Sequence, residues 1–310
     1  TAAANLTPIF AMLCYIIAPA AVTAVGLFQL RHYIGARFSF DRAFVRKVFA
    51  HSIPLLPFSL VGYFSGGYVD AIFVSKFLST HDLGIYAIAT QMNGIAMQLP
   101  TIANALLFPL FVTMQRETEN QRSRNYFRNI LPSLTLLWGS ACAVLAFVAY
   151  FAIPVFFREE FQAAATPLWI LLAASTIGIP VAIGYSALSN ATSTTYVSLI
   201  AAVLSAITNI VANFILIPRY GLAGCAVATA AAFFVSVVIF AVLIRRNLNI
   251  PLSWTFTAIL PCIAGTVAFY ILQSPWIGLA VCLVVSFLIA YLQRDSMNKT
   301  FVFFKNLKTD

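Results

Sequence analysis

The chain has 310 residues, of which 61% are hydrophobic and 9% are charged, and its mean hydropathy is +0.92. A soluble domain carries about 25% charged residues, so this composition excludes a water-soluble globular protein. The net charge is +9, but the cations lie beside the ends of apolar segments rather than in a compact basic domain that could hold a nucleic acid. We therefore expect an integral membrane protein that binds no nucleic acid.

Formal charge is absent from seven long runs, which are residues 1–30, 48–69, 83–115, 129–157, 161–218, 220–244 and 247–293. A helix needs about 20 apolar residues to cross roughly 30 Å of hydrocarbon, and each run is long enough. Polar residues at 189–195 and 273–276 divide two of the runs into two spans each. The runs are continuously apolar rather than alternating, which favours helices over a β-barrel.

The sequence thus predicts an all-α, polytopic integral membrane protein with about nine transmembrane helices. Their centres are expected near Pro19, Gly62, Asn93, Ala143, Ser175, Leu204, Phe233, Gly265 and Val284.

The cations are divided unevenly between the two sides of the membrane. Counting the loops in turn, 15 of the 18 lie on one side, and only Lys76, Arg158 and Arg219 lie on the other. The positive-inside rule makes the richer side cytoplasmic. Because the number of spans is odd, the C-terminal tail is expected in the cytoplasm and the N-terminus outside. The chain also begins at Thr1 without an initiator Met, and we expect the start of the protein to be missing.

We expect the chain to be divided into five consecutive parts. A first span reaches residue 35, and an interfacial cytoplasmic helix covers residues 36–50, where aromatic residues alternate with cations. Residues 51–246 hold the main set of spans, residues 247–293 hold two additional helices, and residues 294–310 form a cytoplasmic tail.

Asp70 is the one carboxylate surrounded by apolar sequence. Burying an ionised carboxylate costs several kcal/mol, so the side chain is expected to face a cavity or a partner, or to stay protonated. This favours a role in ion coupling or substrate contact. Alternatively, a helix that enters near Val48 has already risen roughly 33 Å at Asp70, which would place the carboxylate among the outer headgroups. Both interpretations are open from the sequence.

Uncharged polar residues inside the spans are further candidates for contact with a substrate or a coupling ion. They are Gln91, Asn93, Asn209 and Asn213. Asn209 and Asn213 lie four positions apart, so they share one helix face. The alternative use of these amides is hydrogen bonding between helices.

Patterns typical of catalysis or metal binding are absent from the sequence. The three histidines lie apart, and neither a Gly-rich phosphate loop nor an HExxH motif occurs. The five cysteines lie in separate apolar runs without a CxxC or Cys–His pairing. We expect no catalytic residue, no metal and no cofactor, and a protein that is not an enzyme.

Residues 209–229 resemble a signature of bacterial polysaccharide exporters, the lipid-linked oligosaccharide flippases of the multidrug/oligosaccharidyl-lipid/polysaccharide superfamily. The pattern has two Asn residues, a Leu-Ile-Pro, a Tyr-Gly turn, a further Gly and then small residues up to Ala-Thr. Pro218, Tyr220, Gly221 and Gly224 carry its structural part here. It predicts a helix that ends at Pro218, a tight outer turn at Gly221 and a new helix whose small face packs closely.

Two other segments add to the resemblance. Asp70 followed by residues 84–89 is similar to the family's Asp, outer loop and Gly-x-Tyr-x-x-Ala, although Ala71 stands where many members have Arg. The resemblance to the family also extends to residues 158–161, which precede an Ala-rich helix. The resemblance extends over residues 6–250.

The resemblance implies that the chain corresponds to helices six to fourteen of a fourteen-helix transporter. These are the last helix of the first lobe (residues 1–35), the six-helix second lobe (residues 51–246) and the two terminal helices (residues 247–293). Five helices of the first lobe would be absent.

The resemblance also implies a function. Such a flippase moves undecaprenyl-diphosphate-linked oligosaccharides, the repeat units of O-antigen, capsule or exopolysaccharide, to the outer leaflet of a bacterial inner membrane by alternating access. Its partners are the lipid-linked oligosaccharide and membrane lipids, with the polysaccharide polymerase machinery as a further candidate. One alternative is a multidrug cation antiporter of the same superfamily, which is expected to place more acidic residues in its cavity than Asp70 alone. Another is a non-transporting scaffold for cell-envelope synthesis.

Overall fold

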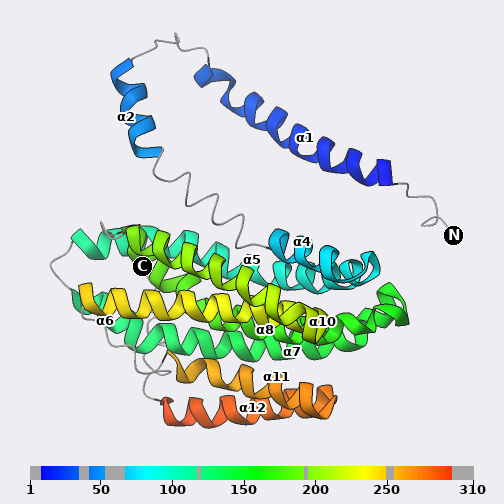
Figure 1. Ribbon diagram of the computed structural model, residues 1–310. Coiled ribbons are helices and arrows are strands. Elements are labelled where there is room, and N and C mark those ends of the chain that lie inside the picture. Colours follow the sequence, from blue (N-terminus) through cyan, green and yellow to red (C-terminus); the bar gives the residue numbers. More distant parts are fainter. Residues whose placement is uncertain are drawn as a thin grey trace. The chain divides into compact units, whose positions relative to one another are not determined.

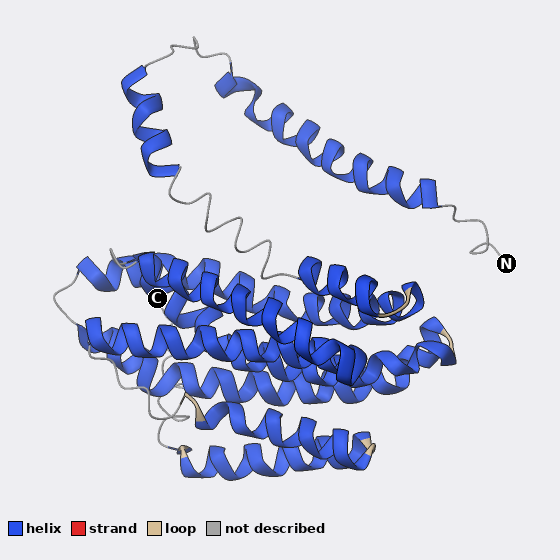
Figure 2. Ribbon diagram, in the orientation of Figure 1, coloured by secondary structure: helices blue, strands red, loops and turns tan. Residues whose placement is uncertain are grey.

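The computed structural model describes residues 8–34, 42–52, 67–116, 120–191, 195–248 and 255–294. Helices are the regular elements in these ranges, and no strand occurs in them (Figure 2). The chain forms two compact units, unit 1 with residues 1–53 and unit 2 with residues 54–310.

Unit 1 contains α1 (Pro8–Ile34) and α2 (Arg42–Ser52) (Figure 1). Apolar side chains such as Ile16, Val22 and Phe28 are exposed on α1. A helix that is apolar on all sides is suited to a membrane. α2 carries the mixture of cations and aromatic residues expected of the interfacial helix, whose first part, residues 36–41, lies outside the described residues.

Unit 2 is a helical bundle around α8 (Ala165–Pro180), in which every residue except Thr166 is buried. α8 packs against α5, α7, α10 and α11 (Figure 1). The other helices are α4 (Gly67–Phe77), α5 (Thr80–Arg116), α6 (Asn120–Asn125), α7 (Leu131–Phe157), α9 (Ser186–Ala191), α10 (Thr195–Leu248), α11 (Leu260–Leu272) and α12 (Pro275–Leu292). Short 3-10 or π turns join them at η2 (Tyr126–Ile130), η3 (Glu159–Ala164), η4 (Val181–Tyr185) and η5 (Thr257–Ile259).

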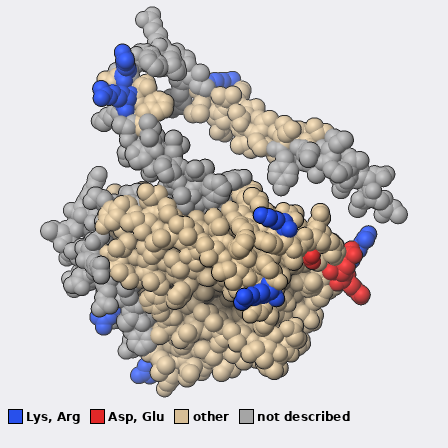
Figure 3. Space-filling model, viewed as in Figure 1, with Lys and Arg blue, Asp and Glu red and all other residues tan. Residues whose placement is uncertain are grey.

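Four helical stretches of the described residues are long and apolar enough to cross a membrane, namely Ser123–Phe157, Glu159–Ala191, Tyr196–Leu243 and Pro275–Leu292. The expectation of an all-α polytopic membrane protein is confirmed. The span centred on Gly62 lies outside the described residues, and the total of nine stays a prediction. On the face of unit 2 in Figure 3, uncharged side chains cover most of the surface and acidic side chains gather at one end.

Two predicted spans form the single 54-residue α10, which reverses its direction inside. The helical conformation continues through Pro218, and the break lies at Gly221, with φ 57° and ψ −135°. The two halves run antiparallel, since the Ser205 hydroxyl donates to the Ala232 carbonyl at 3.0 Å. The prediction that the helix ends at Pro218 is therefore wrong by two residues, whereas the predicted turn at Gly221 is confirmed. Proline only removes one backbone donor, whereas the reversal needs a positive φ, which glycine adopts without strain.

Two π turns, η2 and η4, contact each other within an aromatic cluster of unit 2. The buried Tyr126 hydroxyl donates to the Ile183 carbonyl at 2.7 Å, and the rings of Phe127 and Tyr185 stack at 5.3 Å. These contacts join the start of α7 to the end of α8.

Replacing Tyr126 with phenylalanine is expected to destabilise the protein by about 1 kcal/mol, because the buried Ile183 carbonyl loses its side-chain donor while the ring packing is retained. Thermal unfolding of the purified full-length protein measures this change. Tyr291→Phe is the matched control, since Tyr291 is 63% exposed on α12. Equal unfolding midpoints for the two variants would contradict the prediction.

Candidate functional site

Asp70 lies in the first turn of α4 and is only 3% exposed. Its carboxylate faces α5 and both halves of α10. Among the residues that the structure describes, no Lys, Arg or His lies within ion-pair distance of it. A carboxylate that reached the headgroups would be exposed, so the structure favours the alternative in which Asp70 faces partners inside the protein.

Four neutral donors satisfy the two carboxylate oxygens. Oδ1 accepts from Nδ2 of Asn213 at 2.8 Å and from Nδ2 of Asn209 at 3.2 Å. Oδ2 accepts from the hydroxyls of Thr229 at 2.8 Å and Tyr86 at 2.9 Å. We call these five residues the Asp70 cluster. Three separate stretches of the chain therefore converge on one carboxylate.

The reversal of α10 explains why Asn209 and Thr229 meet. Because the two halves are antiparallel about Gly221, positions 209 and 229 come opposite each other, and Asn209 Nδ2 lies 3.5 Å from the Thr229 hydroxyl. Gly224 lets the halves approach closely, since a Cβ there would lie 2.3 Å from the Leu216 carbonyl oxygen. Asn213 lies one helical turn after Asn209 on the same face and donates to its amide oxygen at 3.1 Å.

A capping interaction fixes the start of α5, which carries Tyr86. The Ser79 amide and hydroxyl donate to the Asp82 carboxylate at 3.1 and 2.7 Å, and the Asp82 amide donates back to the Ser79 hydroxyl at 3.1 Å. This reciprocal pattern satisfies donors at a helix N-terminus. The hydrogen bond from the Ser79 side chain lowers the pKa of Asp82. The short connection holds α4 and α5 in a fixed register at the cluster.

The Asp70 cluster has the chemistry of a site for a small cation. Only neutral groups contact the carboxyl group of Asp70 in the part of the chain that the structure describes. The buried amide oxygen of Asn213 has no hydrogen-bond partner among the described residues, and the Cys225 carbonyl lies 3.4 Å from the Thr229 hydroxyl. Carboxylate, amide, hydroxyl and carbonyl oxygens are ligands that hard cations prefer.

The structure brings together three of the five candidates from the sequence, Asp70, Asn209 and Asn213. Asn93 instead accepts a hydrogen bond from the Ser175 hydroxyl at 2.6 Å, and Gln91 is exposed on α5. Neither residue hydrogen-bonds a member of the Asp70 cluster. Interhelical hydrogen bonding, the alternative use of these amides, is thus seen at Asn93.

Sequence reasoning did not select Tyr86 and Thr229 as site residues. The signal for Thr229 was available, because it ends the Ala-Thr of the motif that begins at Asn209, and the predicted turn at Gly221 folds these two ends back on each other. Tyr86 is the tyrosine of the Gly-x-Tyr-x-x-Ala segment, but its contact with Asp70 depends on how α4 and α5 pack.

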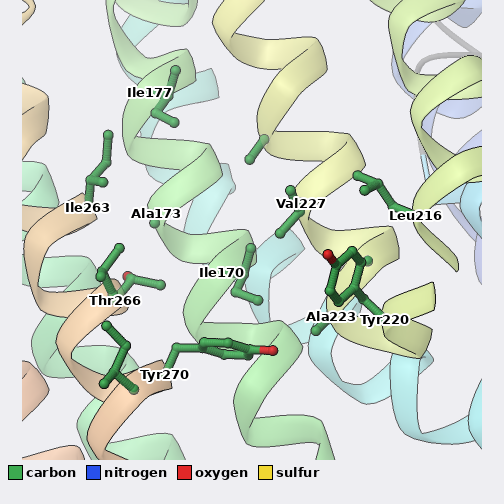
Figure 4. A pocket seen from close by; sticks show the side chains of 14 residues that line it. Ile170, Ala173, Ile177, Leu216, Tyr220, Ala223, Val227, Ile263, Thr266 and Tyr270 are labelled. Atoms are coloured by element: carbon green, nitrogen blue, oxygen red, sulfur yellow. The ribbon is translucent and has the colours of Figure 1, made fainter.

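Part of the predicted structural motif lines an apolar pocket of about 500 Å³ between α8, α10 and α11. Tyr220 and Gly224 contribute from α10, and Ile170 and Ile263 from α8 and α11. Figure 4 shows the ring of Tyr270 extending from α11 beside these aliphatic side chains. Such a lining suits an alkyl or prenyl chain.

The fold and the buried carboxylate define a polytopic membrane protein with an internal polar site. The model of a protein family described as "Polysaccharide biosynthesis protein" matches residues 1–166, more than half of the chain. The chain therefore belongs to this family.

Two individual proteins are similar to the chain. The "Probable low-salt glycan biosynthesis flippase Agl15" of Haloferax volcanii is 29% identical over 198 residues, which cover 63% of this chain and 41% of that protein. The solved structure of "Lipid II flippase MurJ, inward closed conformation" has a TM-score of 0.58 at 16% identity and covers 84% of this chain and 57% of that one. The chain thus matches less than two thirds of either relative's length, and the second similarity shows the fold alone.

Proposed function

We propose that the chain is the C-terminal part of a flippase that moves an undecaprenyl-diphosphate-linked oligosaccharide from the cytoplasmic to the outer leaflet by alternating access. The oligosaccharide is a repeat unit of O-antigen, capsule or exopolysaccharide. The C-terminal tail lies in the cytoplasm of a bacterial cell, and the flippase works in its inner membrane beside the polymerase machinery. The family membership and the glycan flippase similar to this chain support the substrate class.

The Asp70 cluster is the observation that carries the mechanism. A buried carboxylate without a fixed cation is costly in a membrane protein and marks a place where an ion binds or is released. Its ligands come from α4, α5 and α10, so occupation by a cation favours one relative position of these helices. A proton or a sodium ion would drive the change of access in this way.

The apolar pocket supports a substrate with a long lipid part. Its lining residues, such as Ala173, Val227 and Val267, are aliphatic. Binding of an apolar chain in the pocket would leave the sugar and the diphosphate elsewhere on the protein.

The test is transport by the full-length protein in liposomes that contain a fluorescent undecaprenyl-diphosphate-linked disaccharide. A quencher outside the liposomes reports which leaflet holds the lipid. We expect faster translocation than in protein-free liposomes, and a further increase with an imposed cation gradient. Separate proton and sodium gradients distinguish the two coupling ions.

Two results would overturn the proposal. Translocation at the protein-free rate under both gradients would leave a scaffold as the better explanation. Export of a cationic dye without movement of the lipid-linked disaccharide would identify a multidrug antiporter.

A further inference from the structure

One exposed face of α5 carries three uncharged polar residues and a glycine. Gln91, Gly94, Gln98 and Thr101 are all exposed in unit 2. At 3.6 residues per turn, the four positions fall within about 80° of one another around the helix. We call them the α5 polar stripe. Ile85, Ala89 and Ala96 are buried against the bundle on the other side of the same helix.

The exposed surfaces of α7 and α12 have a different composition. Val144, Val148 and Phe151 are exposed on α7, and Val284 and Phe287 are exposed on α12. These surfaces are apolar, as expected for contact with hydrocarbon. The α5 polar stripe thus differs in chemistry from exposed faces of the same bundle.

The two glutamines of the stripe have no hydrogen-bond partner among the residues that the structure describes. An amide that faces hydrocarbon without a partner costs several kcal/mol, so the stripe is expected to face water or a polar ligand. Asn93, two positions after Gln91 on the same helix, is by contrast paired with Ser175. Because no described residue hydrogen-bonds these two amides, they are available to a ligand.

The absence of charged residues near the stripe limits the kinds of ligand that it can bind. Residues 83–115 contain no Asp, Glu, Lys or Arg, so this part of α5 offers no cation to a diphosphate and no anion to a cationic drug. Amide groups donate and accept hydrogen bonds and match the hydroxyl and acetamido groups of sugars. Gly94 leaves room for such a group, since a Cβ there would meet no atom within 4 Å.

We infer that the α5 polar stripe forms one wall of the path of the sugar headgroup and that Gln91 and Gln98 hydrogen-bond the sugar. This inference rests on the proposed function and adds to it the residues that recognise the sugar by hydrogen bonds. The lipid diphosphate is recognised elsewhere.

The first experiment measures access from water. Cysteine is introduced in the full-length protein at Gln91 or Gln98, and at the adjacent, exposed apolar positions Ile95 or Leu99 as controls. We expect a water-soluble maleimide to label the stripe positions at least about tenfold faster, because a thiol surrounded by lipid does not ionise. An undecaprenyl-diphosphate-linked disaccharide should slow the labelling, whereas undecaprenyl diphosphate without sugar should not.

The second experiment measures affinity. Gln91→Ala combined with Gln98→Ala should weaken binding of the disaccharide-linked lipid about tenfold, the loss expected for two neutral hydrogen bonds. Binding of undecaprenyl diphosphate should stay unchanged. Ile95→Ala combined with Leu99→Ala is the matched control and should retain both affinities.

Labelling no faster than at the controls would overturn the inference, because the stripe would then pack against protein or lipid. Fast labelling without protection by the disaccharide-linked lipid, or equal affinities in the wild type and the glutamine variant, would also overturn it. Failure of the wild type to translocate the lipid-linked disaccharide would instead refute the proposed function, so the two failures are distinguishable.

Discussion

Replacing Asp70 with asparagine is expected to abolish cation-driven translocation while the protein still folds. The amide keeps the size of the side chain and part of its hydrogen bonding with Thr229 and Asn213 but loses the negative charge. A unit charge at about 4 Å contributes roughly 4 kcal/mol at an effective dielectric constant near 20, which corresponds to about a thousandfold in cation affinity. The measurement is transport in liposomes under proton and sodium gradients, together with direct binding of sodium.

Ser140→Ala is the control for this prediction. Its hydroxyl lies 3.0 Å from that of Ser286 between α7 and α12, so the variant also loses an interhelical hydrogen bond but no charge. Its transport should equal that of the wild type. Normal coupled transport by Asp70→Asn at unchanged expression would show that Asp70 is structural and that the coupling ion binds elsewhere.

Composition was sufficient to predict the fold class, for a physical reason. Unpaired backbone groups are too costly in hydrocarbon, so continuous apolar runs can only become helices. The break between α11 and α12 was likewise predictable, since Gln273 with φ 51° ends the first helix and Pro275 starts the second. Proline is favoured at a helix start because it lacks the donor that is unsatisfied there.

The partners of the cluster depend on packing, which the sequence pattern does not reveal. Asp70, Asn209 and Asn213 stood out because polar residues are rare in such runs. Their mutual distances depend on the register between α4 and the two halves of α10, and Gly221 rather than Pro218 sets that register. Gln91 and Asn93 stood out equally in the sequence. They lie on different faces of α5, so Gln91 is exposed whereas Asn93 pairs with Ser175.

Replacing Gly224 with alanine is expected to damage both stability and cation binding. The new methyl group would lie 2.3 Å from the Leu216 carbonyl oxygen and 3.2 Å from the Ile217 nitrogen. These are backbone atoms that cannot rotate away, so the two halves of α10 must separate. Overpacking of this kind costs about 3 kcal/mol. Because Thr229 lies on the displaced half, its 2.8 Å bond to Asp70 should lengthen as well.

Thermal unfolding and sodium binding by the full-length protein measure the two effects. Gly84→Ala is the matched control, because its methyl group, near the start of α5, would meet no atom within 4 Å. It should unfold and bind sodium like the wild type. If Gly224→Ala is destabilised but binds sodium normally, the close approach of the helix halves serves stability alone and does not position Thr229 at the Asp70 cluster.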